Sequence, residues 1–129
     1  MRLLIDTQCW LWMQAEPDRF RSETRKLLLD PGNELYLSAA SSWEIAIKYA
    51  LGKLPLPEPP STYVPSRMQS SGVIGLAIEH AHALHVDGLP PHHRDPFDRL
   101  LIAQAQLEAM SILSADRAFA LYPVTILAP

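Results

Sequence analysis

Two aspartates stand three residues apart in the stretch HHRDPFDRLLIAQAQ, which covers residues 92–106. The second half of the stretch is an apolar run with helical spacing, and Pro96 suits the first position of that helix. Asp95 then falls at the N-cap, where an aspartate accepts backbone N–H groups, and Arg99 can pair with it along the outer face. A structural role therefore accounts for Asp95 without any chemistry.

Asp98 has a different environment in the same helix. Its neighbours at helical spacing are all apolar, namely Leu101, Ile102, Ala105 and Ala109. Asp98 therefore heads the stripe that packs on the rest of the protein, and its carboxylate is directed inward. A buried, unpaired carboxylate is costly, so first-turn N–H groups or a bound cation must compensate it. An acid that only interacts favourably with the helix dipole explains the residue equally well at this level.

Three more acidic residues occupy positions near the expected ends of strands and helices. Asp6 and Asp116 each follow a short apolar run that predicts a strand, and aspartates after strands most often serve as turn or cap residues. Glu44 closes the pattern Ser-Ser-Trp-Glu, which fits a capping box with Ser41, and it can pair with Lys48 four residues on. Taken alone, Glu44 fits these structural roles better than a catalytic one.

Other side chains capable of chemistry form no convincing arrangement. His82 and His85 share a spacing that zinc ligands use, but no partner falls at a matching interval, so a solvated helix face is favoured. His92 and His93 lie in a proline-bounded loop and are expected to be solvated, although their closeness to the two aspartates leaves a substrate contact open. No glycine-rich nucleotide loop or G-x-S-x-G elbow is present, and no motif activates Cys9.

The elements that must position the acids alternate between strands and helices. Strands are expected at 3–5, 35–38, 73–76, 111–115 and 124–127, and helices at 10–14, 19–30, 41–51, 78–86 and 96–110. The segment 54–66 holds five of the twelve prolines and predicts a loop that leads into a helix at its far end. This alternation predicts a three-layer α/β domain with a mainly parallel sheet, in which ligands bind outside the carboxyl ends of the strands.

Composition narrows the class of protein further. The 129 residues are expected to form one domain, 1–129, and 48% hydrophobic with 19% charged residues is typical of a folded chain. The net charge of −3 argues against general coating of nucleic acid, although bound divalent cations can neutralise an acidic site that handles phosphates. One cysteine excludes an internal disulfide, and no run suits a signal peptide or membrane span, so a cytoplasmic protein is expected.

Four motifs follow one another along nearly the whole chain: LLIDTQCWLW, LSAASSWEIAIK, HRDPFDRLLIAQA and LSADRAFALY. In this order and at these intervals they resemble the motifs of the PIN-domain family, specifically the VapC-like toxin ribonucleases of bacterial toxin–antitoxin pairs. That family has a Rossmann-like α/β fold with a parallel sheet and a site of three or four acidic residues that binds Mg²⁺ or Mn²⁺. One departure is Gln8-Cys9, where relatives usually have His or Asn.

The resemblance assigns roles to particular residues of this chain. It implies that the catalytic and metal-binding acids are Asp6, Glu44, Asp98 and Asp116. Hard divalent cations prefer oxygen ligands, which these carboxylates offer. Residues expected to contact substrate or to lie behind the ligands are Thr7, Asp95, Arg99 and Arg117, with Arg94 as a further candidate for RNA phosphates.

The function implied by the resemblance is Mg²⁺- or Mn²⁺-dependent RNA cleavage by a metal-activated water, in a toxin held by a small antitoxin protein. A homodimer or a toxin–antitoxin hetero-oligomer is expected, without membrane association, and part of the apolar run 10–13 is a candidate docking surface. The alternatives are a housekeeping RNA-processing nuclease, a non-catalytic binding module of the same fold, and a metal-dependent phosphomonoesterase. A neighbouring antitoxin gene would argue against the first alternative, and the intact acid set argues against the second. Activity on p-nitrophenyl phosphate but not on RNA would favour the third.

Overall fold

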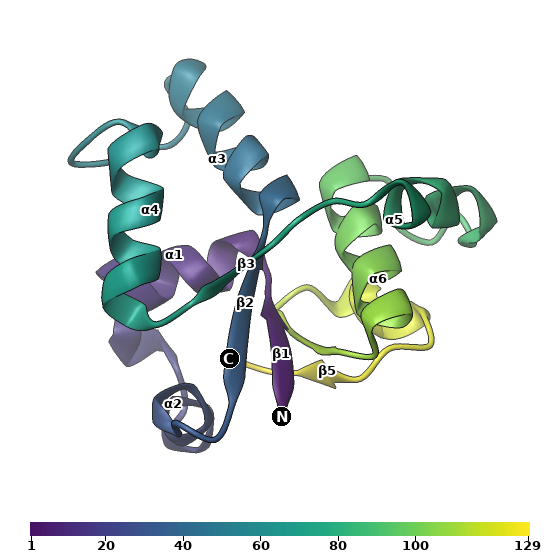
Figure 1. Cartoon of the computed structure of the whole chain (residues 1–129), viewed down its shortest axis with the longest axis horizontal. Helices are drawn as coiled ribbons and strands as arrows, with labels where there is room; N and C mark the ends of the chain where they lie inside the picture. The colour runs from purple at the N-terminus through teal and green to yellow at the C-terminus, as the bar shows by residue number, and fades with distance from the viewer.

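Five parallel strands form one sheet in the computed structural model, which describes all residues 1–129. The strand order is β3-β2-β1-β4-β5, so the chain builds outward from β1 in both directions. In Figure 1, α1, α2 and α4 lie to one side of the sheet, and α5 and α6 lie to the other. The predicted three-layer α/β architecture with a parallel sheet is confirmed.

The strands are β1 (Arg2–Ile5), β2 (Glu34–Ser38), β3 (Ile74–Leu76), β4 (Ser111–Leu113) and β5 (Ile126–Leu127). The α-helices are α1 (Thr7–Ala15), α2 (Ser22–Leu29), α3 (Ala39–Ala50), α4 (Pro60–Ser71), α5 (His80–His85) and α6 (Pro96–Glu108). Three short 3₁₀ helices complete the chain: η1 (Pro17–Arg19), η2 (Val86–Gly88) and η3 (Arg117–Leu121). None of these helices is both long and apolar enough to cross a lipid bilayer.

The central strand β1 divides the core into two layers. Successive side chains of a strand point to opposite faces, so Leu3 and Ile5 join the core beneath α1 and α4, whereas Leu4 joins the core beneath α6. Leu4 pairs in register with Tyr36 on β2 and with Ile112 on β4. Burial on both faces explains why β1 is continuously apolar rather than alternating.

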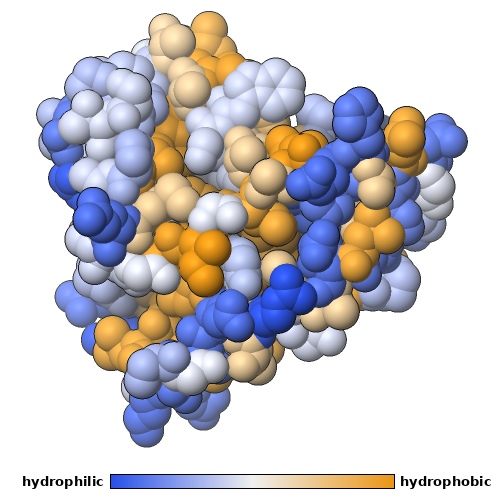
Figure 2. Space-filling view, in the orientation of Figure 1, coloured by the Kyte–Doolittle hydropathy of each residue, from blue (hydrophilic) through white to orange (hydrophobic).

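Figure 2 shows apolar residues gathered in the hollow of the visible face, between the α4 side and the α5–α6 side. A shallow groove of about 340 Å³ lies next to β3 and is lined by Leu37, Ala39, Ser42, Met68, Gly75, Leu76 and Ala77. The hydrophilic residues gather mainly around the hollow.

Two helices begin earlier than the sequence predicts, because residues at the ends of strands act as caps. Asp6 accepts the Cys9 N–H and so starts α1 at Thr7, directly after β1. Ser38 accepts the Ala40 N–H and starts α3 at Ala39. Each cap satisfies one of the free N–H groups of a helix start. Strand, cap and helix are therefore continuous at both places.

The proline-rich segment forms less loop than predicted. Helix α4 begins at Pro60, where the missing N–H of proline has no cost, and it continues through Pro65. Tyr63 and Val64 are buried between these prolines and fix the helix on the core. Gly72 ends α4 with a φ of 68°, a left-handed conformation that glycine adopts without strain.

Candidate active site

A cleft of about 370 Å³ opens at the carboxyl edge of the sheet. Its lining brings together all four acids singled out from the sequence, and comprises Asp6, Thr7, Gln8, Glu44, Lys48, Asp95, Asp98, Ala115 and Asp116. The residues come from the ends of β1 and β4, from the start of α1, and from α3 and α6. The cleft therefore collects side chains from widely separated parts of the chain around β1, where the strand order reverses.

Asp6 lies at the end of β1 and is as deeply buried as Glu44, with 6% of its surface exposed. Its Oδ1 accepts the Cys9 N–H at 2.8 Å. Burial raises the pKa of Asp6, and nearby Glu44 adds to that effect, while hydrogen bonds from Ser114 and Cys9 oppose it. Asp6 is both a helix cap and a cleft residue, so the structural and functional interpretations are compatible.

Glu44 faces the cleft from the second turn of α3, because the helix starts at Ala39. The predicted capping box with Ser41 is therefore wrong. Glu44 Oε1 accepts the Thr7 hydroxyl at 2.7 Å, and Glu44 Oε2 pairs with Lys48 Nζ at 2.6 Å. The hydrogen bond to Glu44 raises the pKa of Lys48. The predicted Glu44–Lys48 pair is confirmed, but it lies inside the cleft.

The two aspartates of HHRDPFDRLLIAQAQ have different environments. Asp95 caps α6, as predicted, since its Oδ1 accepts the N–H groups of Phe97 and Asp98 at 2.8 and 3.3 Å. Asp98 projects into the cleft, and its side chain is 19% exposed. Burial and the nearby Asp95 carboxylate raise the pKa of Asp98 to about 7; His93 opposes the shift, and the more distant acids add to it.

The expected pair between Arg99 and Asp95 does not form. Arg99 instead donates to backbone carbonyls of the loop that precedes α6, at Val86, Leu89, Pro90 and His93. A guanidinium offers five donors in a fixed fork, and clustered carbonyls at the end of η2 satisfy it better than one carboxylate already occupied as a cap. Arg99 therefore stabilises this loop and does not line the cleft.

Asp116 follows β4 and caps the short helix η3. Its Oδ1 accepts the Ala118 N–H at 2.9 Å, and its Oδ2 lies 2.8 Å from His93 Nε2. Partial burial acts to raise the pKa of Asp116, but the Ala118 N–H and the His93 ring outweigh it and leave that pKa below its usual value. The pKa of Asp116 is therefore lowered, whereas that of Asp98 is raised.

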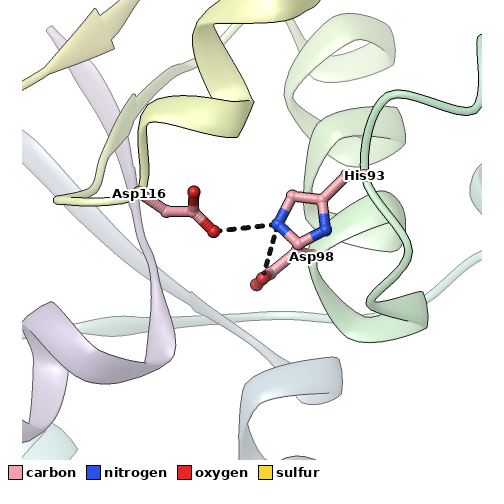
Figure 3. A group of neighbouring side chains, drawn as sticks. All are labelled: His93, Asp98 and Asp116. Atoms are coloured by element: carbon pink, nitrogen blue, oxygen red, sulfur yellow. Dashed lines mark hydrogen bonds and ion pairs between the residues drawn. The ribbon is translucent and has the colours of Figure 1, made fainter.

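His93 belongs to the site, whereas the sequence predicted a solvated side chain and left a substrate contact as the alternative. The expectation that its side chain is solvated is wrong, because that side chain is 12% exposed and its Nε2 lies 3.1 Å from Asp98 Oδ2 as well as 2.8 Å from Asp116 Oδ2. Figure 3 shows the ring between the two carboxylates. The only available signal was the position of His93 just before the two aspartates of α6. The contact with Asp116 spans 23 residues and has no local pattern.

Several other expectations concern side chains outside the cleft. His82 is buried, not solvated, and its Nε2 lies 2.9 Å from Glu108 Oε1. His85 is hydrogen-bonded to Gln106. Arg94 and Arg117 are exposed, and neither lines the cleft or forms an ion pair. They are available to a ligand, but nothing directs them toward the acids.

A parallel sheet with helices on both faces and a carboxylate-lined cleft at its carboxyl edge defines an α/β protein with a polar ligand site at the strand-order reversal. A model of the PIN domain family matches residues 3–124. The chain therefore belongs to the PIN domain family.

Individual relatives agree with this assignment. Ribonuclease VapC16 of Mycobacterium tuberculosis is 55% identical over 64 residues, a match that covers 50% of this chain and 45% of that protein. VapBC2 from Rickettsia felis, solved with a DNA fragment from its promoter, has a TM-score of 0.71 at 14% identity and covers 99% of this chain and 98% of its own. FitAcB from Neisseria gonorrhoeae has a TM-score of 0.65 at 19% identity, covering 97% and 96%.

Proposed function

We propose that the protein is a divalent-cation-dependent endoribonuclease that acts as the toxin of a toxin–antitoxin pair. The observation that carries the proposal is the cleft in which Asp98, with a pKa raised to about 7, faces Asp6, Glu44 and Asp116. The similarity to a ribonuclease and to VapBC complexes supports RNA as substrate and a small protein as partner. Cleavage of cellular RNA implies action in the cytoplasm.

The donor set in the cleft fits Mg²⁺ or Mn²⁺. Carboxylate oxygens are the ligands that these hard cations prefer. A bound cation stabilises most the ionised form of a carboxylate that is partly buried and repelled by other acids, such as Asp98. The ligands are Asp6, Glu44 and Asp98, with Asp116 binding directly or through water. When bound, the cation supplies Lewis acidity toward water and phosphate oxygens.

The side chains around these acids fix the oxygens rather than react. Thr7 donates its hydroxyl to Glu44 Oε1, and Lys48 holds Glu44 Oε2, so both oxygens of this carboxylate have a defined direction. The Cys9 N–H fixes Asp6 Oδ1 in the same way. Of the four acids, Asp98 has the fewest polar contacts, because its carboxylate meets only His93, whereas Glu44 and Asp116 each have two partners. Asp98 is thus the acid most available to a cation.

The test is cleavage of a panel of structured RNAs by the purified protein with Mg²⁺ or Mn²⁺. Addition of EDTA and the substitution D98N should each abolish cleavage, while D98N leaves the fold intact because asparagine has nearly the same shape. Cleavage that survives both EDTA and D98N would contradict the proposed chemistry. Activity on p-nitrophenyl phosphate without activity on RNA would support a phosphomonoesterase instead.

A separate test addresses the protein partner. Trp12 and Met13 on α1 are only partly buried, and Leu29 at the end of α2 is 81% exposed. Such apolar side chains are suited to an inhibitor's apolar segment, although Trp10 itself is fully buried in the core. Expression of the protein alone should arrest growth, and co-expression of the adjacent small gene should relieve the arrest. Harmless expression of an active enzyme in its native host would contradict the toxin role.

A further inference from the structure

His93 connects two acids that lie far apart in the sequence. Its Nε2 is 2.8 Å from Asp116 Oδ2 and 3.1 Å from Asp98 Oδ2 (Figure 3). Two further contacts hold the residue: the His93 backbone N–H donates to the Tyr122 hydroxyl at 2.9 Å, and the ring packs edge-on against Phe119 with centroids 5.7 Å apart. A ring fixed in this way is a rigid link between the carboxylates.

The other ring nitrogen determines where the proton lies. His93 Nδ1 accepts the backbone N–H of Asp95 at 3.1 Å. In a neutral imidazole one nitrogen donates and the other accepts, and the partner of one fixes the role of the other. Because Nδ1 is the acceptor, Nε2 carries the proton and donates toward the two carboxylates.

The same contact argues against His93 as a metal ligand. A histidine that binds a cation through Nε2 must carry its proton on Nδ1, where it usually donates to an acceptor. At His93 that proton would point at the Asp95 N–H, so two donors would face each other. His93 is thus fitted to donate a hydrogen bond to the acids and not to join them in the first coordination sphere.

We propose that His93 is a positioning residue, locked by the Asp95 backbone as the Nε2–H tautomer, which holds Asp98 and Asp116 in the arrangement that receives the cation. The inference rests on the proposed function, since it names a residue that prepares the same metal site. Asp116 has its Oδ1 on the Ala118 N–H and its Oδ2 on His93. Asp98 has only Oδ2 on His93. His93 thereby leaves Asp98 Oδ1 as the carboxylate oxygen that would be free to bind the cation.

The tautomer is testable in the metal-free protein. Two-bond ¹H–¹⁵N correlation spectra of the labelled chain report which ring nitrogen carries the proton, and the H93Q spectrum assigns the signals of His93 by their loss. We expect a protonated Nε2 and an unprotonated Nδ1 at pH 7.5. A proton on Nδ1, alone or together with one on Nε2, would overturn the proposal.

The positioning role is testable with a matched set of substitutions. Glutamine places an N–H donor near the position of Nε2, whereas asparagine is too short and reaches only the position of Nδ1. We expect H93Q to keep the Mn²⁺ affinity within about threefold and H93N to lose at least about tenfold, as is typical when a group behind metal ligands is removed. H92Q and H92N serve as controls, because His92 is exposed and touches the Tyr122 ring rather than an acid.

Calorimetric titration with Mn²⁺ and melting curves for all five proteins separate the possible failures. Equal Mn²⁺ affinity in H93N and the wild type, with matched melting temperatures, would overturn the positioning role while the metal site stands. If the wild type binds no Mn²⁺, the proposed function fails, and the tautomer spectrum still decides the geometry of His93. A loss of Mn²⁺ affinity in H93Q as large as the loss in H93N would also overturn the role of the Nε2–H donor.

Discussion

Lys48 is the single cationic side chain that lines the acidic cleft. Its side chain is half exposed, and its ammonium nitrogen lies 2.6 Å from the buried carboxylate of Glu44. Exposed ion pairs contribute little to stability, but removing the cationic partner of a buried acid is costly, because a buried charge is left unpaired. Lys48 therefore balances Glu44 in the metal-free protein and competes with a cation for the same oxygen.

We expect K48M to lower the melting temperature of the metal-free protein and to raise its Mn²⁺ affinity several-fold. The loss of the ammonium leaves Glu44 without a countercharge until a cation binds, so added Mn²⁺ should restore most of the lost stability. Melting curves with and without Mn²⁺ measure both effects. K53M is the control, because Lys53 is exposed and has no acidic partner. Unchanged or weaker Mn²⁺ binding by K48M would show that Lys48 supports the site instead.

The sequence predicted the acids better than it predicted their neighbours. The positions of Asp6, Asp98 and Asp116 in the cleft are predictable because local features, a strand end or a helix stripe, determine them. Glu44 was ambiguous because its role depends on the residue at which α3 starts. The start at Ala39 moves Glu44 out of the first turn. His93 was missed because its contact with Asp116 is made by tertiary packing alone.

Among the elements, α6 combines a cap and a cleft residue within its first turn. Asp95 accepts two N–H groups at the helix start, and its charge also raises the pKa of Asp98. Asparagine caps a helix about as well as aspartate does but has no charge. The two roles of Asp95 can therefore be separated by substitution.

We expect D95N to be at least as stable as the wild type at pH 7.5, because it keeps the cap and removes repulsion with Asp98. D95A should be about 1 kcal/mol less stable than D95N, since alanine cannot cap. Urea unfolding of the three proteins measures the difference. D95N should retain Mn²⁺ binding, whereas its loss would mean that Asp95 acts as a ligand.

The C-terminal end of α6 has an unusual residue. Ala109 has a φ of 55°, although it is not glycine, and it ends the helix in the left-handed conformation. Gly72 ends α4 in the same conformation, with no atoms near the position of a Cβ. An alanine in this region is strained, and glycine removes the strain at some cost in chain entropy.

A109G should therefore stabilise the protein by about 0.5 kcal/mol, and G72A should destabilise it by about 1 kcal/mol. Both residues are exposed at the ends of their helices, so packing contributes little to either effect. The urea unfolding midpoints of the two variants show the direction of each change in stability. Destabilisation by A109G would indicate that the Ala109 methyl group has a packing role that outweighs its strain.

Element types were largely predictable, whereas element starts were not. Apolar runs predict all five strands, most clearly β1 and β4, because buried parallel strands are continuously hydrophobic. The sequence predicts later starts for α1 and α3, because it does not show that the polar residues at the strand ends, Asp6 and Ser38, cap the helices that follow directly. The start of α4 at Pro60 was hidden by the proline-rich composition, which predicts a loop unless burial of Tyr63 and Val64 is known.

At the scale of the whole molecule, the acidic cleft links folding to protons and to cations. Burial and neighbouring Asp95 raise the pKa of Asp98 from 3.8 to about 7, and burial also raises that of Asp6. The folded protein therefore binds more protons than the unfolded chain between about pH 4 and pH 7. Stability falls with rising pH in any interval where the folded state holds the extra proton. The contribution of Asp98 is thus favourable at low pH and is lost as the pH rises toward 7.

We therefore expect the metal-free wild type to lose stability relative to D98N as the pH rises from 5 to 8. Asparagine has no charge to bury, so D98N should melt several degrees above the wild type at pH 8, with a smaller gap at pH 5. A saturating concentration of Mn²⁺ at pH 8 should reverse the order, because a ligand that binds only the folded state stabilises it and D98N has lost a carboxylate that binds it. Melting curves of both proteins at the two pH values, with EDTA or with Mn²⁺, test all three statements. If the difference in melting temperature does not change with pH, a countercharge must already balance the ionised Asp98 carboxylate in the folded protein. Lys48, whose ammonium lines the same cleft, would be the first countercharge to examine.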